Sequence, residues 1–526
     1  MTSSEPGLPS TERNQGVSGA TGRAVLQGST WSAARIVGPQ LFVLVVSVAA
    51  ARFLGPDGMG RQSFIAFIAL SVAAIFSGGI AQMLTRYVGE GIGAERGPQT
   101  RGLITSTYRV GLLGAGAGAG AMIAAGLLGA EPAAAWVLAG VGCGLAIAQA
   151  MPNAILSGTL RWRETSIIGL TTGALAVPAT ITVLAADGGI TGFFAVETAA
   201  IAANLAWSEI LCRRAMRDLG PEVAHDKALE RQAWSFAGLT TISIVLATVV
   251  FKRSEFFFLQ HYADDAAIAI YSIAFASVFA ITALAEALGN TVMPAFATLF
   301  GGGADERIRL GFERGQRLLI LFSLPLTAAA IALGPQLISL VYGGEYAESG
   351  ELLQIMALGI PLLALMGLAR AFLGGLGKVK PMLVTTGVAA VANLSLAFAL
   401  IPSEGARGAA LANLGSQLIA GGITIAYADR LLGRHGVHSR TLFATLVASA
   451  AAGVLGSLTA ETLGGIAGVL LGATATAVGF TAIAMLVKPI RPDDADWLRG
   501  STAGTPLARA ADLACRAFAS PAPAAA

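Results

Sequence analysis

Long apolar stretches follow one another along almost the whole chain, and the charged residues fall almost entirely between them. A helix needs about 20 apolar residues to cross a hydrocarbon core roughly 30 Å thick, and most of the stretches reach that length. Charged residues make up 12% of the chain, well below the share typical of soluble domains, and the mean hydropathy is +0.69. The pattern predicts an all-α polytopic membrane protein.

We expect about 14 transmembrane helices, with the following ranges: 30–53, 62–85, 103–129, 134–158, 165–186, 190–212, 234–260, 266–298, 316–342, 350–375, 381–401, 408–428, 441–460 and 463–487. The stretch 266–298 is too long for one straight crossing, so we expect it to leave the membrane or to kink near Pro294.

Basic residues alternate with the predicted spans. The loops of one side hold only Arg52, Arg61 and Arg407, beside several carboxylates, and the loops of the other side hold most of the remaining arginines and lysines. Because basic loops stay in the cytoplasm, the alternation predicts a multi-pass protein of the cell membrane with both termini cytoplasmic. The basic loop residues include Arg86, Arg96, Arg101, Arg161, Arg163, Arg213, Arg214, Arg217, Lys227, Arg231, Arg307, Arg309, Arg314, Arg317, Lys378, Lys380, Arg430, Arg434 and Arg440.

The chain also contains an internal repeat. Three pairs of segments match in the same order: 57–67 with 265–275, 154–163 with 371–380, and 189–192 with 405–408. We therefore expect spans one to six to be related to spans seven to twelve by a pseudo-two-fold axis along the membrane normal. Such symmetry is typical of alternating-access transporters, whose substrate path lies between the two halves.

The repeat suggests a division of the chain into six parts: a cytoplasmic N-terminal tail at 1–29, a first six-helix bundle at 30–217, a cytoplasmic linker at 218–233, a second six-helix bundle at 234–430, two additional transmembrane helices at 431–488, and a cytoplasmic tail at 489–526. We expect the last part to be disordered, with a short amphipathic helix around 507–518 as the alternative.

Several function classes are disfavoured by the residues themselves. No loop is long enough for a catalytic domain, so we expect neither an enzyme nor catalytic residues. Cys143, Cys212 and Cys515 form no metal-binding motif, and no Walker A sequence is present, so we expect no metal and no cofactor. The formal net charge of +3 comes from the basic loops and reflects topology, so we expect no nucleic-acid partner. The glycine run 114–120 has Gly-x-x-x-Gly spacings, which favour close packing between helices over nucleotide binding.

Three short motifs resemble those of a known transporter family. Residues 51–60 resemble the first outer loop of polysaccharide exporters, and 341–346 are similar to a "YGxxY" signature. Residues 400–412 look like the "LIPxxGxxGAAxA" stretch between spans eleven and twelve. The resemblance covers about residues 25–500 and points to the polysaccharide-transporter branch of the multidrug/oligosaccharidyl-lipid/polysaccharide exporter superfamily.

This resemblance implies a flippase that moves a polyprenyl-diphosphate-linked oligosaccharide across the cytoplasmic membrane for cell-surface polysaccharide synthesis. The implied partners are that glycan substrate, membrane lipids, a proton or sodium gradient, and a polysaccharide polymerase. A multidrug or small-molecule exporter of the same superfamily is the nearest alternative. A membrane polysaccharide polymerase or ligase is a further alternative, which the short outer loops disfavour.

Charged and amide side chains inside the predicted spans are the candidate site, because such groups are costly in lipid and usually functional. Candidates for binding the substrate diphosphate and sugar are Arg253, Lys252, Arg35, Arg370 and Asn290. Candidates for ion coupling are Glu255, Glu286 and Glu197.

Each candidate also has a structural interpretation. Arg35 and Arg370 lie near the inner ends of their spans, where they can extend to the lipid head groups. Lys252 and Glu255 are three residues apart, so they share one helix face and can form an ion pair. Glu197 and Glu286 can equally well form structural contacts, each between its own helix and a neighbouring helix.

Overall fold

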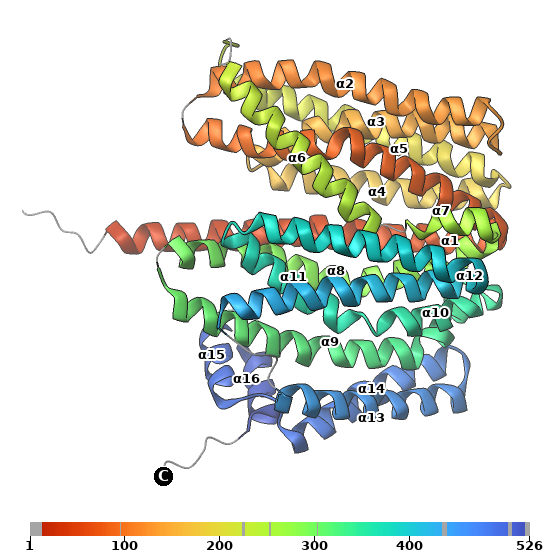
Figure 1. The fold of residues 1–526 in the computed structure, drawn as a ribbon, viewed down its shortest axis with the longest axis vertical. Helices are drawn as coiled ribbons and strands as arrows, with labels where there is room; N and C mark the ends of the chain where they lie inside the picture. The colour runs from red at the N-terminus through yellow and green to blue at the C-terminus, as the bar shows by residue number, and fades with distance from the viewer. Residues whose placement is uncertain are drawn as a thin grey trace, which may run out of the picture. The chain divides into compact units, whose positions relative to one another are not determined.

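A computed structural model gives the fold of the chain, which is all-helical over the residues that it describes (Figure 1). The backbone is described at 13–94, 96–223, 227–251, 254–301, 303–433, 439–502 and 508–520, and for some helical stretches, among them 13–37 and 283–295, only the backbone is described. The helices, in chain order, are α1 Arg13–Gly93, α2 Gly97–Leu127, α3 Ala133–Gly158, α4 Trp162–Ala185, α5 Gly189–Asp218, α6 Lys227–Phe251, α7 Glu255–Tyr262, α8 Asp265–Gly301, α9 Asp305–Val341, the short 3-10 helix η1 Gly344–Tyr346, α10 Ala347–Ala357, α11 Ile360–Gly375, α12 Val379–Leu431, α13 Ser439–Leu463, α14 Gly465–Val487, α15 Pro492–Thr502 and α16 Ala508–Phe518.

Ten helices within the described ranges are long and apolar enough to cross a membrane. An eleventh span is added when the segments 344–357 and 360–375, which meet at a bend of 48°, are taken as one. The prediction of an all-α polytopic membrane protein is therefore confirmed.

Two of these candidate spans are much longer than a bilayer is thick. They run from Gly38 to Ile92 and from Lys380 to Leu431, and at 1.5 Å per residue each is close to 80 Å long. Each contains one glycine outside the helical region, Gly55 with φ 69° in α1 and Gly405 with φ 53° in α12. Residues with a side chain rarely adopt a positive φ, so glycine suits both of these positions.

Some predicted spans differ from the observed helices. The predicted span 234–260 corresponds to two elements, since α6 ends at Phe251 and α7 begins at Glu255. The predicted span 350–375 likewise corresponds to α10 and α11. By contrast, α8 continues through Pro294 as one helix to Gly301.

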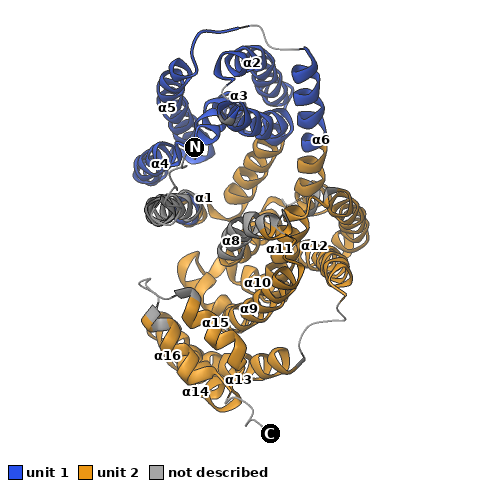
Figure 2. Ribbon diagram, turned by 90° about the vertical axis from the view of Figure 1, so that its left-hand side faces the viewer, with its two compact units in different colours: residues 1–46, 72–241 blue, residues 47–71, 242–526 orange. Residues whose placement is uncertain are grey.

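The chain divides into two compact units, which are coloured separately in Figure 2. Unit 1 consists of residues 1–46 and 72–241, and unit 2 of residues 47–71 and 242–526. The bend of α1 at Gly55 therefore belongs to unit 2, although the helical segments on either side of it continue into unit 1.

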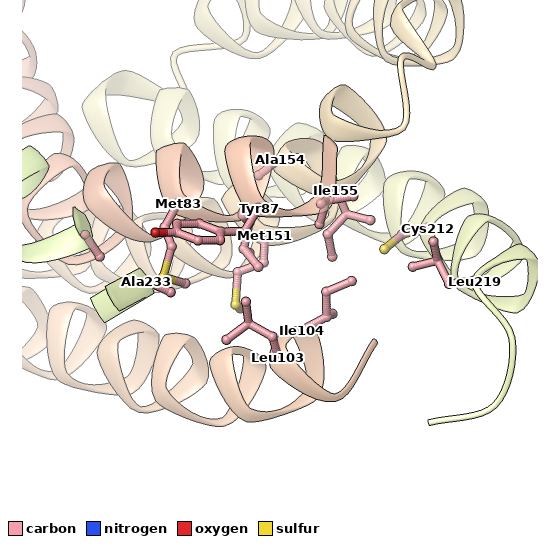
Figure 3. Close-up of a cluster of buried hydrophobic side chains, with 13 residues drawn as sticks. Met83, Tyr87, Leu103, Ile104, Met151, Ala154, Ile155, Cys212, Leu219 and Ala233 are labelled. Carbon is pink, nitrogen blue, oxygen red and sulfur yellow. The ribbon is translucent and has the colours of Figure 1, made fainter. Parts of the chain in front are cut away.

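Unit 1 is held together by side chains from five helices (Figure 3). Met83 and Tyr87 of α1, Leu103 of α2, Met151 of α3 and Cys212 of α5 are all nearly or fully buried in this cluster, which Ala233 of α6 completes. Between helices that lie in lipid, packing of this kind is stabilised by van der Waals contacts rather than by the hydrophobic effect.

Close packing of α2 against α3 depends on small residues. A Cβ atom built on Gly118 would lie 2.6 Å from Cδ1 of Ile147, and one on Gly144 would lie 3.1 Å from the carbonyl oxygen of Ala115. The predicted packing role of the glycine run is confirmed for Gly118. It is wrong for Gly116 and Gly120, because a Cβ atom on either would meet nothing within 4 Å.

Within unit 2, the α1 bend (residues 47–71) is anchored by polar contacts. Arg52 donates hydrogen bonds of 2.7 and 2.9 Å to the carbonyl oxygens of Leu340 and Val341 at the end of α9. The Tyr346 hydroxyl donates to the carbonyl of Ala51 at 3.0 Å, and Arg61 pairs with Asp265 at 2.9 Å.

The C-terminal tail contains two helices, α15 and α16, and packs within unit 2. Arg317 of α9 forms two hydrogen bonds of 2.7 Å with the carboxylate of Asp494 in α15, and both side chains are almost fully buried. The helix α16 occupies the position of the predicted amphipathic helix, and buried Cys515 faces α15 through a contact with the carbonyl of Ala495. The expectation of a disordered tail is therefore wrong for these two helices.

Candidate functional site

Glu255 is the first residue of α7 and has no solvent exposure. It lies next to the point where α6 ends and α7 begins, within what the sequence predicts as one span. Membrane transporters commonly place ion and substrate sites where a transmembrane helix is interrupted, because the free backbone groups there are polar. A carboxylate at the first position of a helix is also favoured by the helix dipole.

Two asparagine side chains of α12 hold the carboxylate of Glu255. Asn393 donates from Nδ2 to Oε1 at 2.8 Å, and Asn413 donates from Nδ2 to the same oxygen at 3.2 Å. The two asparagines lie on opposite sides of Gly405, so the turn at this glycine brings both segments of α12 to one carboxylate.

Two serines orient the Asn393 amide. The Ser254 hydroxyl donates to Asn393 Oδ1 at 2.9 Å, which leaves the amide nitrogen facing Glu255. The same nitrogen donates to the Ser416 hydroxyl at 3.1 Å, and Ser416 in turn donates to the carbonyl of Asn413 at 2.8 Å. All of these side chains are buried. We call Ser254, Glu255, Asn393, Asn413 and Ser416 the carboxylate–amide cluster.

Aromatic side chains cover this cluster. Phe256, adjacent to Glu255, is fully buried and packs edge to face on Phe67 at 5.3 Å and on Tyr271 at 5.9 Å between ring centroids. Such a wall excludes water and strengthens the electrostatic interactions inside it.

The cluster has the chemistry of a proton or cation site. The Oε2 atom of Glu255 is buried and accepts no hydrogen bond, and Glu255 forms no ion pair, among the residues that the structure describes. A buried carboxylate without a cationic partner is stable only when it is protonated or holds a cation. Two amide nitrogens already donate to Oε1, so over the described residues Oε2 is the oxygen of Glu255 that is left for a proton or a cation.

The other candidate residues from the sequence are distributed more widely. Lys252 and Arg253 lie outside the described residues, and for Arg35 of α1 and for Glu286 and Asn290 of α8 only the helical backbone is described. Arg370 is half-buried in α11. Glu197 is exposed in α5 and belongs to unit 1, whereas Glu255 belongs to unit 2.

Sequence reasoning missed the amide side chains. Asn393, Asn413 and Ser416 were not selected, although polar groups within predicted apolar spans were a usable signal. It also missed a polar network in unit 1, where Asn204 of α5 contacts Gln149 of α3 and donates to Thr172 of α4 at 3.1 Å. Ser208 extends this network by donating to Asn153 at 3.0 Å.

Residues 240–399 match the family model described as MatE, and this range includes Glu255 and Asn393. A curated relative, described as a probable multidrug resistance protein NorM of Rhizobium meliloti (strain 1021), is 32% identical over 163 residues. The match takes in 29% of this chain and 34% of the relative, so the chain spans about a third of the relative that it matches.

Two solved structures extend the likeness to most of the chain. A lipid II flippase MurJ in an inward closed conformation superposes with a TM-score of 0.66 at 12% identity, over 87% of this chain and 98% of that one. An inward-facing multidrug resistance MATE family transporter of the MOP superfamily superposes with a TM-score of 0.61 at 14% identity, over 75% and 94%.

The chain therefore has the fold of the MOP superfamily of membrane transporters. By their descriptions the two solved structures are a flippase and a transporter and the curated relative is a probable multidrug resistance protein, and none of the three is described as an enzyme.

Proposed function

We propose that this protein is an ion-coupled exporter that works by alternating access and uses Glu255 as its coupling carboxylate. The observation that carries the proposal is the carboxylate–amide cluster, in which a buried carboxylate accepts hydrogen bonds from the neutral amides of Asn393 and Asn413 and forms no ion pair over the described residues. Loading and release of a proton or a sodium ion at this carboxylate changes the charge buried in unit 2. That change biases the conformational equilibrium between the inward and outward states.

The proposed substrate is a polyprenyl-diphosphate-linked oligosaccharide, delivered from the cytoplasmic leaflet to the outside for surface polysaccharide synthesis. The support is the coverage of the likenesses, since the lipid II flippase accounts for 87% of this chain and the MATE transporter for 75%. In the proposed layout α13 and α14 follow a core of twelve crossings, and two such added helices would account for the larger covered share.

Cationic side chains are proposed to hold the diphosphate, and Arg253, Lys252, Arg35 and Arg370 are the candidates, with Asn290 as a hydrogen-bond donor to sugar. Glu286 and Glu197 remain candidates for a second coupling group. A polysaccharide polymerase is a proposed partner that receives the product.

The proposed topology has fourteen crossings with both termini cytoplasmic, arranged as two six-helix repeats at 30–217 and 234–430 followed by α13 and α14. It counts α1 and α12 as two crossings each, since both exceed one bilayer thickness and turn at a glycine. It also counts α6 with α7, and α10 with α11, as one crossing each. Cysteine accessibility from either side tests it, and the expected result is that labels at Asp57 and Ser403 react only from outside.

The function is tested by reconstitution into liposomes. A fluorescent polyprenyl-diphosphate oligosaccharide is supplied with a proton or a sodium gradient, and head-group flipping is followed by accessibility to an impermeant quencher. We expect gradient-dependent flipping by the wild type, loss in Glu255→Gln, and loss in Arg253→Ala. Flipping that is identical in Glu255→Gln and wild type contradicts the coupling role.

The second candidate is an ion-coupled multidrug exporter. It is favoured by the MatE match and by the 32% identity to the probable multidrug resistance protein. Gradient-driven efflux of a lipophilic cation by the same liposomes, with no flipping of the lipid-linked sugar, identifies this function instead. The assays of the wild type distinguish the two substrates. The Glu255→Gln variant tests the coupling role, whichever substrate is transported.

A further inference from the structure

A basic pocket of about 720 Å³ lies between the end of α1 and the beginning of α6. Its lining residues all belong to unit 1, so one packed unit forms it. They are Arg86, Tyr87, Lys227, Ala228, Arg231, Gln232, Ser235, Phe236 and Leu239. The proposed transport function uses none of them.

Among the residues that the structure describes, the lining carries three cations and no carboxylate. Lys227 and Arg231 form no ion pair over the part of the chain that the structure describes, and both are exposed. Arg86 contacts Glu90 at 4.0 Å, and both side chains are at least half exposed, so water screens that pair. An anion entering the pocket therefore meets an excess of positive charge.

Aromatic rings fix the position of one cation. The Arg86 guanidinium lies 4.8 Å from the ring centre of Phe236 and 5.4 Å from that of Tyr87. The two rings meet edge to face at 6.2 Å. A guanidinium held by stacking keeps its N–H groups free to donate, and its planar arrangement of donors suits phosphate oxygens.

Polarity changes along the pocket. Lys227, Arg231, Ser235 and Leu239 follow one another at intervals of four residues, so they form one row on the surface of α6. The row begins with two cations and ends with a leucine that is 62% exposed, and Ile242, three residues further on, is 55% exposed. The basic end lies at the start of α6, beside the predicted cytoplasmic loop, and the apolar end lies farther along the helix, within the predicted span 234–260.

We propose that this pocket binds an anionic phospholipid of the cytoplasmic leaflet, with its phosphate between Arg86, Lys227 and Arg231 and its acyl chain along Leu239. A charged head joined to an apolar tail matches the order of side chains along the row. A free phosphate matches only the basic end and leaves the exposed leucine unused. The cytoplasmic leaflet is the one that carries anionic lipid, and each lysine or arginine near it contributes to attraction.

The test compares lipid binding by three proteins in detergent and in nanodiscs. The pocket variant carries Arg86→Gln, Lys227→Gln and Arg231→Gln. The charge-matched control carries Arg214→Gln, Arg217→Gln and Arg430→Gln, three exposed cations predicted on the same side and outside the pocket lining. The probes are phosphatidylglycerol, phosphatidylcholine and inorganic phosphate, and the readouts are lipid retention by native mass spectrometry and the shift of Tm.

We expect phosphatidylglycerol to bind the wild type and the control equally and to lose affinity in the pocket variant, by roughly fivefold for each cation removed. Phosphatidylcholine and inorganic phosphate are expected to bind weakly to all three. Equal affinity of phosphatidylglycerol for the pocket variant and the control overturns the proposal. Stabilisation by inorganic phosphate as strong as that by phosphatidylglycerol overturns the lipid assignment.

A second variant keeps the proposal testable if the triple substitution prevents folding. Gln232→Glu adds one carboxylate to the lining and removes no cation or ring. We expect it to weaken phosphatidylglycerol binding while the Tm without lipid stays that of the wild type. Unchanged phosphatidylglycerol binding in this variant counts against the proposal.

Discussion

Asn393 donates a hydrogen bond of 2.8 Å to Glu255, and the two residues lie 138 positions apart in the chain. The bond joins the start of α7 to the first segment of α12, and Asn413 joins the second segment to the same oxygen. One carboxylate thus connects three helical segments of unit 2. A change in its protonation or cation occupancy therefore alters contacts with all three segments.

Glu255→Gln is expected to abolish gradient-driven transport, by at least about tenfold, because an amide neither releases a proton nor neutralises a bound cation. Its size keeps the cluster filled, so the Tm should change little. The measurement is uptake into liposomes with and without an imposed gradient. Full gradient dependence in this variant argues against Glu255 as the coupling group.

Asn393→Leu is expected to destabilise unit 2. It removes the shorter of the two hydrogen bonds to Glu255 and leaves a buried carboxylate less satisfied, at a cost of about 1–3 kcal/mol. The measurement is the Tm in detergent. The control is Ser403→Ala, an exposed residue of α12, which should leave the Tm unchanged. A Tm equal to that of the control contradicts the structural role of the amide.

Gly60→Ala is expected to disturb the α1 bend. A Cβ atom at this position would lie 1.6 Å from the carbonyl oxygen of Asp265, so the backbones must move apart. Overpacking of this kind typically costs about 1–3 kcal/mol. Gly116→Ala is the matched control, since a Cβ atom there has open space. Equal Tm values for the two variants would mean that the bend does not approach α8 as described.

Asp494→Asn is expected to release the two C-terminal helices. Arg317 and Asp494 are 7% and 4% exposed, and Arg317 keeps Glu313 at 3.7 Å as a second partner, so the cost is that of buried hydrogen bonds to a charged group, about 1.5–3 kcal/mol. Limited proteolysis should cut after α14 faster in this variant than in the wild type. Asp496→Asn is the control, because the Asp496 side chain is 77% exposed and its loss should leave the cleavage rate unchanged.

The sequence was sufficient for the class of protein and for one residue of the candidate site. Apolar runs of bilayer length and their alternating basic loops predicted a polytopic helical protein, and the motifs led to the superfamily whose fold the chain has. Glu255 could be selected because a carboxylate inside an apolar run can be recognised from the sequence alone. Its partners Asn393 and Asn413 could not be selected in this way. A single asparagine changes the mean hydropathy of a span little, and both lie far from Glu255 in the chain.

The sequence by itself therefore determined that the chain lies in the membrane and which strongly polar groups its helices carry, because the bilayer acts as a solvent on each segment separately. Tertiary structure decided the rest. The turn at Gly405 brought two amides to one carboxylate, the bend at Gly55 joined the segment 47–71 to unit 2, and the packing of α6 against α1 gathered three cations into one pocket. These features depend on contacts between distant segments, and no local pattern records which segments will meet.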